Sequence, residues 1–420
     1  MSTEVYTNIK YLVNARQHSH LLRGIELAKL PVIENAYLII EDGIIADSGP
    51  MRNFTKDYSG GEGLVGAILP CWCDSHTHLV FAGSRDNEFV DKIKGMSYAE
   101  IAAKGGGILS SVKKLHDTSE DELFNQSWKR LEEVSKLGTG AIEIKSGYGL
   151  TLDGELKILR VIKKLKERSS LSIKATFLGA HTYPTQYKED HQGYIDLIIN
   201  EMLPVIAREK LADYIDVFCE QGFFSAEETD RICRAGMSYG LKPKLHVNQL
   251  DSIGCIEKGI KLNAVSLDHL ETLTEKEIEL LTSPPAILQK ERGENHPICT
   301  LLPTAAFFLR MPLQPARKLI DAGCAIALAS DYNPGSSPSG NMNFVISLSC
   351  IQMKMLPEEA INAATINGAY AMDLGEVLGS ITVGKKANLI FTKSIPSLAY
   401  LPYSFGSNLI DKVMIEGRFI

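Results

Sequence analysis

The sequence lacks the features of a membrane protein, a secreted protein or a nucleic-acid-binding protein. It contains no apolar run near the roughly 18 residues that a membrane-spanning helix needs. Its first residues, Met1 to Tyr6, have neither the basic region nor the apolar core of a secretory signal. The net charge of −7 argues against a polyanionic partner such as nucleic acid. We therefore expect a cytoplasmic protein without membrane or nucleic-acid partners, and a small anionic substrate remains open.

Cysteines are also sparse, with eight scattered through 420 residues. Several lie inside apolar, strand-like runs, as in Phe218-Cys219-Glu220. This pattern is typical of reduced, buried thiols and not of a disulfide framework. The pair Cys71-x-Cys73 has a spacing that can bind metal, but it flanks a stronger candidate ligand pair.

The two ends of the chain share a β-rich pattern that the middle does not have. Residues 36–49 predict two short strands joined by a turn at Asp42-Gly43. Residues 379–391 and a last strand, 413–417, are their counterpart near the other end. We expect both ends to build one small β-sandwich domain. Two unrelated additions to the middle are the alternative.

Between these ends, apolar strand-like runs alternate with helical stretches. The runs are residues 67–79, 141–147, 173–181, 215–223, 243–249, 264–270, 285–289 and 325–331. Ser119 begins one helix that ends near Gly138, and Ser225 begins another that ends near Gly240. Apolar strands separated by helices indicate a parallel sheet covered on both faces, and eight such units suit a closed barrel of roughly 250 residues. We therefore expect a parallel eight-stranded barrel of the TIM type, with an open doubly wound sheet as the alternative.

These patterns divide the chain into two expected domains. The small β-sandwich domain takes residues 1–67 together with residues 377–420. The barrel takes residues 68–376.

Polar residues collect where the apolar runs end. Six of them lie at or just beyond the C-terminal ends of different runs: Tyr148, His181, Glu220, His246, His269 and Asp331. In a parallel barrel these ends converge on one face, where catalytic groups gather. A single residue of this kind is often a buried polar group with its hydrogen bonds satisfied, but six at the same end of six strands predict a functional site.

His76-Thr77-His78 is the sharpest local motif. Residues i and i+2 of a strand project from the same face, so both imidazoles can bind one ion. His246 supplies a third nitrogen and Asp331 a carboxylate oxygen. Three imidazoles and one carboxylate suit zinc or iron and leave a position for water. The sequence therefore predicts one Zn²⁺ or Fe²⁺/Fe³⁺ ion per chain, bound by these four side chains.

Four segments, residues 74–83, 143–150, 178–181 and 329–336, carry a resemblance that extends over nearly the whole chain. The chain resembles the imidazolonepropionase family, the histidine-degradation branch of the amidohydrolase superfamily. The second and fourth segments are specific to that family, whereas the His-x-His motif marks only the superfamily. The resemblance implies the same four metal ligands, a homodimer, and hydrolysis of a cyclic amide. The implied reaction opens the ring of 4-imidazolone-5-propanoate to give N-formimidoyl-L-glutamate.

The resemblance also implies the residues that contact the substrate. They are Arg85, Tyr148, His181, Asn333, Gly335 and Ser336. The planar fork of Arg85 suits a propionate carboxylate, although a surface charge is the alternative interpretation. The chain departs from the family at Gln249, where many members carry an acidic residue that meets the substrate ring. An amide can hydrogen-bond the ring but cannot take a proton.

We therefore assign the proton transfers to Asp331 and His269. A metal lowers the pKa of a bound water from roughly 15.7 to about 7. Asp331 can accept the proton as attack begins, and His269 can hydrogen-bond the developing oxyanion or relay a proton. Residues 290–297, a polar stretch, are interpreted as a surface loop or the edge of a lid.

Two alternatives to this function remain. Within the superfamily, the chain could be a mononuclear deaminase or a hydrolase of another cyclic amide. From a different class, it could be a non-catalytic barrel scaffold, but such proteins usually lose metal ligands, and this sequence has all four.

Overall fold

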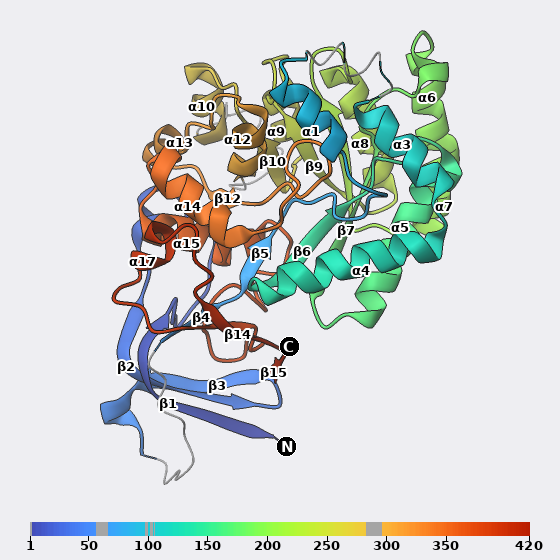
Figure 1. Cartoon of the computed structure of the whole chain (residues 1–420). Coiled ribbons are helices and arrows are strands. Elements are labelled where there is room, and N and C mark those ends of the chain that lie inside the picture. Colours follow the sequence, from blue (N-terminus) through green and yellow to red (C-terminus); the bar gives the residue numbers. More distant parts are fainter. Residues whose placement is uncertain (1, 56–65, 97–99, 101–103, 105, 283–295) are drawn as a thin grey trace.

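The computed structural model describes residues 2–55, 66–96, 100, 104, 106–282 and 296–420. Strands from both ends of the chain form the lower part of the molecule in Figure 1, and a larger part of strands and helices lies above them. None of the described helices combines the length and the apolar character that crossing a membrane requires.

A seven-stranded sheet joins the two ends of the chain, in the order β15-β14-β13-β4-β1-β2-β3. Its strands are β1 Thr3–Val13, β2 Val32–Glu41, β3 Ile44–Pro50, β4 Ala67–Pro70, β13 Leu389–Thr392, β14 Ile410–Ile415 and β15 Arg418–Phe419. β4 connects the two ends, because it pairs in parallel with β1 and antiparallel with β13. The prediction that both ends contribute to one sheet is confirmed.

Asp42 and Gly43 form the predicted turn between β2 and β3. Both have positive φ angles, 48° and 79°, as a two-residue type I′ turn requires. Just after this turn, Ile45 N donates to Lys385 O, and Gly384 N donates to Ile45 O, both at 2.9 Å. These hydrogen bonds fold the sheet over one apolar core, to which both ends of the chain contribute. The buried residues of this core include Ile9, Leu38, Ile68, Leu389 and Phe391.

The apolar run at residues 67–79, expected as one barrel strand, divides at Cys71. Cys71 N donates to Asn388 O in the terminal sheet, whereas Trp72 N donates to Gly138 O at the start of the barrel. The backbone therefore changes partners between two adjacent residues, and β5, Trp72–Asp74, opens the barrel. The domain boundaries drawn at residues 67/68 and 376/377 stay a prediction.

Eight parallel strands build the barrel, in the order β5 to β12. After β5 these are β6 Thr139–Lys145, β7 Ser172–Ala180, β8 Tyr214–Cys219, β9 Lys242–Val247, β10 Ser266–His269, β11 Ile298–Leu301 and β12 Ile326–Leu328. The seventh strand corrects an expectation, because Ile298–Leu301 holds the place between β10 and β12. The run expected there, residues 285–289, lies outside the described residues, as does most of the predicted loop at residues 290–297.

The barrel closes between its first and last strands, just beyond β5 and β12. Thr77 and Tyr332 form a parallel bridge. Asp331 N donates to His76 O at 3.0 Å, and His78 N donates to Tyr332 O at 2.9 Å. The parallel eight-stranded barrel is thus confirmed, and the alternative of an open doubly wound sheet is wrong.

Helices cover the outside of the barrel (Figure 1). They are α1 Asp86–Ile93, α3 Ile108–Asp117, α4 Glu120–Lys136, α5 Leu152–Arg168, α6 His191–Leu197, α7 Leu203–Glu209, α8 Ala226–Ser238, α9 Cys255–Lys261, α10 Glu275–Thr282, α12 Pro303–Leu309, α13 Ala316–Ala322, α14 Met342–Met353, α15 Pro357–Ala364, α16 Ile366–Tyr370 and α17 Tyr400–Tyr403. The Ser119 side chain accepts from Glu122 N at the start of α4, and Ser225 accepts from Glu228 N at the start of α8. Both predicted helix starts are confirmed.

The expectation that all eight cysteines are reduced is wrong for two of them. Cys219 at the end of β8 and Cys255 at the start of α9 form a disulfide, with Cα atoms 6.1 Å apart. The two cysteines meet because the end of β8 lies beside the start of α9, the helix that follows the neighbouring strand β9. The other six cysteines are free thiols. Cys71 and Cys73 direct their sulfur atoms to backbone carbonyls, those of Met414 and Cys71.

Candidate active site

A cavity of about 420 Å³ opens where the C-terminal ends of the barrel strands converge. It is lined by ten of the residues that the sequence predicted for the site: His78, Arg85, Tyr148, His181, Gln249, His269, Asp331, Asn333, Gly335 and Ser336. The other two, His76 and His246, are buried and contact the ring of His78 or the carboxylate of Asp331. The structure therefore brings these twelve residues together. Glu220, which its place at a strand end also predicted for the site, does not line the cavity; its carboxylate accepts from the backbone N–H groups of Gln221, Leu250 and Asp251.

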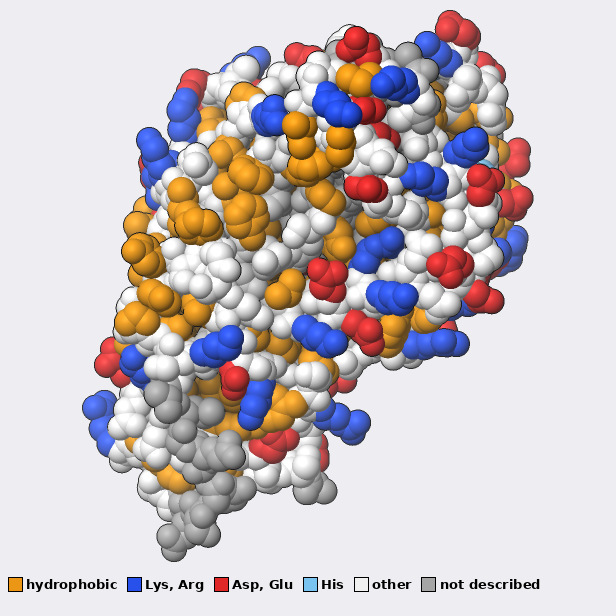
Figure 2. All heavy atoms as spheres, in the orientation of Figure 1, with side chains coloured by type: hydrophobic (Ala, Val, Ile, Leu, Met, Phe, Trp, Pro, Cys, Tyr) orange, Lys and Arg blue, Asp and Glu red, His pale blue; other side chains and the backbone are white. Residues whose placement is uncertain are grey.

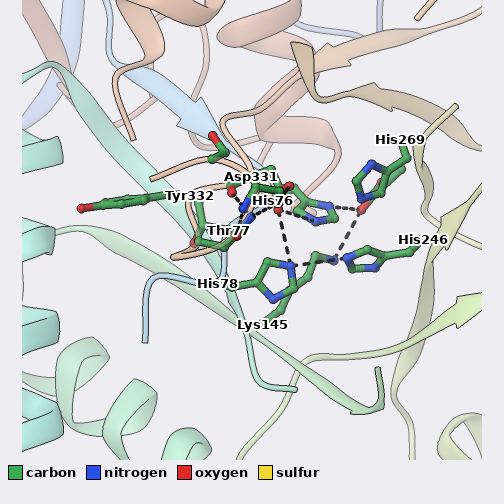
Figure 3. A network of polar contacts seen from close by, with 12 residues as sticks. His76, Thr77, His78, Lys145, His246, His269, Asp331 and Tyr332 are labelled. Atoms are coloured by element: carbon green, nitrogen blue, oxygen red, sulfur yellow. Dashed lines mark hydrogen bonds and ion pairs between the residues drawn. The ribbon is translucent and has the colours of Figure 1, made fainter. Parts of the chain in front are cut away.

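Four of these side chains converge closely (Figure 3). His76 Nε2 and His78 Nε2 lie 3.6 and 3.5 Å from the same oxygen, Asp331 Oδ1. His246 Nε2 lies 3.4 Å from His78 Nε2. His76 Nε2 is buried without a hydrogen-bond partner among the described residues. Because an unsatisfied buried nitrogen is costly, this atom fits a site that binds a cation.

A divalent metal ion fits this set of donors. Burial lowers the pKa of His76, His78 and His246 well below the usual value, so their rings are neutral and can donate a lone pair. Neutral imidazoles with one carboxylate are ligands that suit such an ion. The donor atoms of His76, His246 and His269 also lie within 4.8 Å of one another, which places His269 at the edge of the same site.

Two aspartates that the sequence analysis missed lie behind the histidines. Asp268 Oδ2 is 2.7 Å from His76 Nδ1, and Asp216 Oδ2 is 2.8 Å from His246 Nδ1. Each carboxylate fixes Nδ1 as the donor and leaves Nε2 facing the metal site. A signal was present in the sequence, because both aspartates are charged residues inside otherwise apolar strand runs.

Further buried charges continue this arrangement into the barrel. Lys145 Nζ lies 2.7 Å from Glu143, 2.8 Å from Asp216 and 3.4 Å from Asp268. Lys244 pairs with the other oxygen of Glu143. Three carboxylates thus meet two ammonium groups, which leaves one negative charge in excess before the metal-facing aspartate is counted. A cation bound at the site would offset this excess.

Asp331 is held by the turn that follows it, in a left-handed backbone conformation with φ 51°. Asn333 Nδ2 donates to the Asp331 carbonyl at 2.7 Å, and Asn333 Oδ1 accepts from the N–H groups of Gly335 and Ser336. Ser336 Oγ donates to Asp331 Oδ2 at 3.3 Å. The Asn333 amide therefore shapes the turn around Asp331. Burial raises the pKa of Asp331 to about 6.

His269 also has a left-handed backbone, with φ 87°. Its Nδ1 lies 3.3 Å from Glu271 Oε1, which accepts a second hydrogen bond from Gln314 Nε2. Burial lowers the pKa of His269, but Glu271 and then Asp331 outweigh this effect and raise it above the usual value. His269 is therefore suited to carry a proton near neutral pH.

Aromatic rings form one wall of the cavity. The His181 ring stacks on His78, with centroids 5.3 Å apart and planes 13° apart. Its Nδ1 lies 3.0 Å from the Gly147 carbonyl, which makes Nδ1 the donor. Burial lowers the pKa of His181 to about 4, so the ring is neutral. Tyr148 lies beside both rings, and burial raises the pKa of its hydroxyl.

Arg85 lies at the mouth of the cavity, so the alternative of a free surface charge is wrong. Its Nε and Nη2 bond to Glu88 Oε2 at 2.9 and 2.7 Å. A Cβ atom at position 335 would lie 2.1 Å from Arg85 Nη1, so Gly335 leaves the room that the guanidinium needs. Lys92 and Phe308 also line the mouth. The sequence analysis missed them because they lie on helices and not at strand ends.

Comparison with known proteins agrees with this site. The amidohydrolase family matches residues 67–420. An imidazolonepropionase from Flavobacterium johnsoniae is 58% identical over 418 residues, 98% of each chain. The chain belongs to the imidazolonepropionase family of amidohydrolases. Another imidazolonepropionase, from Christiangramia forsetii, is 55% identical over the full length of both chains. A guanine deaminase from C. acetobutylicum has a TM-score of 0.69 over 100% of both chains at 17% identity, which shows a shared fold.

The raised pKa of Asp331 predicts a pH-dependent effect of Asp331→Asn on the metal-free protein. Below the unfolded-state pKa of about 3.9, the carboxyl is protonated in both states. As the pH rises through about 6, the folded protein must carry a buried negative charge, and the stabilising contribution of the proton is lost. We expect the substitution to raise the unfolding temperature at pH 8 and to change it little at pH 4, close to the unfolded-state pKa.

Thermal unfolding in the presence of a chelator measures this difference. Asp411→Asn, at an exposed position, is the control and should have no such pH dependence. An equal effect of Asp331→Asn at both pH values would show that Asp331 is not a buried carboxylate of raised pKa.

Proposed function

We propose that this chain opens the ring of 4-imidazolone-5-propanoate with water to give N-formimidoyl-L-glutamate. The observation that carries the proposal is the identity of 58% and 55% with two imidazolonepropionases over the whole length of the chain. The cavity supports it, because it contains groups suited to each requirement of cyclic-amide hydrolysis.

The proposed ligands of one Zn²⁺ or Fe²⁺/Fe³⁺ ion are His76, His78, His246 and Asp331. Their convergence and the unsatisfied Nε2 of His76 support this assignment. When bound, the ion supplies Lewis-acid polarisation and a more acidic water. The protein contributes the neutral imidazoles and the two aspartates that orient two of them.

Proton transfer is proposed to use two side chains. Asp331 accepts the proton of the attacking water as the new C–O bond forms. His269 hydrogen-bonds the developing oxyanion or relays the proton, and Glu271 holds it in place. The ring C–N bond then breaks, and the nitrogen leaves with the proton that the water gave up.

The remaining groups suit a substrate with a neutral ring and one carboxylate. Tyr148, His181 and Gln249 are proposed to contact the ring, and all three line the cavity. The Gln249 amide can only hydrogen-bond there. Arg85 is proposed to bind the propionate carboxylate, with Glu88 holding one edge of the guanidinium. Asn333, Gly335 and Ser336 would complete the site.

We also propose that the chain forms a homodimer. Exposed apolar side chains gather on the left of the face shown in Figure 2, over α12 and α14. Phe307, Ile351, Leu356 and Phe405 are 55%, 56%, 49% and 64% exposed. A second copy of the chain would cover such a patch.

Sedimentation velocity of the parent protein should give twice the chain mass. A Phe307→Ser/Ile351→Ser variant should sediment as a monomer, because it loses two apolar side chains of the proposed interface. A monomeric parent protein would contradict the proposal.

The ligand assignment predicts that His246→Ala removes most of the bound metal and abolishes turnover, because the site loses one of its nitrogen donors. Elemental analysis measures the metal, and mass spectrometry follows N-formimidoyl-glutamate formed from 4-imidazolone-5-propanoate. His191→Ala is the control, because its half-exposed ring contacts Tyr183 and Glu228 outside the site. Stoichiometric metal and a normal rate in His246→Ala would disprove the assignment. A parent enzyme that binds metal but leaves this substrate intact would disprove the proposed reaction.

The proposed role of Arg85 predicts the effect of Arg85→Met, which keeps the apolar stem and deletes the fork. A charge-assisted hydrogen bond contributes about 1.5–3 kcal/mol, so kcat/KM should fall at least about tenfold, since ~1.36 kcal/mol is a factor of ten. The loss should appear mainly in KM, because the carboxylate is remote from the reacting bond. Metal content should not change, and Arg85→Lys should restore activity only in part. Kinetics equal to those of the parent enzyme would exclude Arg85 from the carboxylate site.

A further inference from the structure

A buried cation that the proposed mechanism does not use lies behind the metal-facing histidines (Figure 3). Lys145 is the last residue of β6 and has no exposed surface. Its Nζ contacts Glu143 Oε1 at 2.7 Å, Asp216 Oδ2 at 2.8 Å and Asp268 Oδ2 at 3.4 Å. A buried charge is costly unless its partners offset the loss of water, so its particular partners indicate what it does.

The aspartate oxygens that Lys145 contacts are the same ones that orient the histidines. Asp216 Oδ2 also accepts from His246 Nδ1 at 2.8 Å, and Asp268 Oδ2 accepts from His76 Nδ1 at 2.7 Å. One ammonium group therefore connects two carboxylate–imidazole pairs. The residues of these pairs come from β8, β9, β10 and the segment after β5.

The other oxygen of each aspartate is already occupied. Asp216 Oδ1 accepts from the backbone N–H of His246 at 3.1 Å, and Asp268 Oδ1 accepts from the hydroxyl of Ser266. Each Oδ2 atom is thus shared between Lys145 and one imidazole. Without the ammonium, the two carboxylates would repel each other, and each would lose the contact that holds its Oδ2 atom in place.

We infer that Lys145 is a positioning residue of the metal site, which fixes through Asp216 and Asp268 the directions of the Nε2 atoms of His246 and His76. The inference rests on the ligand assignment of the proposed function but not on the identity of the substrate. Removal of the outer partners of metal-binding histidines typically weakens metal binding by about 10–100-fold.

Lys244 offers a matched comparison. It is as deeply buried as Lys145 and lies on β9. It pairs with Glu143 and donates to the carbonyls of Ser75 and Ala371. These partners do not include the aspartates behind the histidines. Loss of Lys244 therefore removes the same buried charge without releasing Asp216 or Asp268.

The test compares Lys145→Met and Lys244→Met by two measurements on the full chain. Competition with a chelator gives the affinity for Zn²⁺, and the visible absorption of the Co²⁺-loaded protein reports the arrangement of the ligands. Lys145→Met should weaken Zn²⁺ binding about 10–100-fold and shift the Co²⁺ bands. Lys244→Met should lower stability but change Zn²⁺ affinity less and leave the bands in place. Equal losses of affinity, or an unchanged Co²⁺ spectrum in Lys145→Met, would overturn the inference.

A second pair of variants applies if Lys145→Met does not fold. Asp268→Asn is compared with Asp268→Asn/Lys145→Met, which retains the net buried charge of the parent protein. The double variant should bind Zn²⁺ more weakly than Asp268→Asn, because Asp216 has then lost its ammonium partner; equal affinities would overturn the inference. Neither comparison depends on turnover, and His246→Ala tests the ligand assignment separately, so failure of the inference and failure of the proposed function are distinguishable.

Discussion

The hydrogen bonds that close the barrel are the constraint on which the site depends. They join the first and last strands through Asp331 N and His76 O, and through His78 N and Tyr332 O. The residues that complete the sheet are therefore the ones whose side chains converge beneath the cavity. Because no loop separates the proposed ligands from this seam, opening the barrel here would separate His76 and His78 from Asp331.

Several residues in and behind the site are poorly suited to stability alone. Lys145, Glu143 and Asp216 occupy the barrel interior as charges, where apolar side chains would avoid the cost of desolvation. His269 and Asp331 adopt left-handed backbone conformations, which are costly for residues other than glycine and collect at functional sites. Lys145, His269 and Asp331 lie at or just beyond the C-terminal ends of their strands, where parallel barrels carry their chemistry. The site therefore accounts for them better than the requirements of folding do.

Local signals explain how much of the site could be predicted from the sequence. The i, i+2 spacing of His76 and His78, and polar residues that follow apolar runs, need no knowledge of other strands. Asp216 and Asp268 were missed because their role depends on the register between β8, β9 and β10. The disulfide between Cys219 and Cys255 was missed because 36 residues separate them. The seventh strand, Ile298–Leu301, was missed because another apolar run, residues 285–289, took its place in the expected alternation of strands and helices.

Attack of water on the carbonyl carbon of a cyclic amide is the step on which the proposed function depends. Mass spectrometry of the product formed by the metal-loaded protein from 4-imidazolone-5-propanoate in ¹⁸O-labelled water tests it directly. We expect one ¹⁸O atom per N-formimidoyl-glutamate, in the newly formed carboxylate, with both nitrogen atoms retained. An ¹⁸O atom on the carbon between the two nitrogens, or release of ammonia, would contradict it, because water would then have attacked the amidine carbon as in a deaminase.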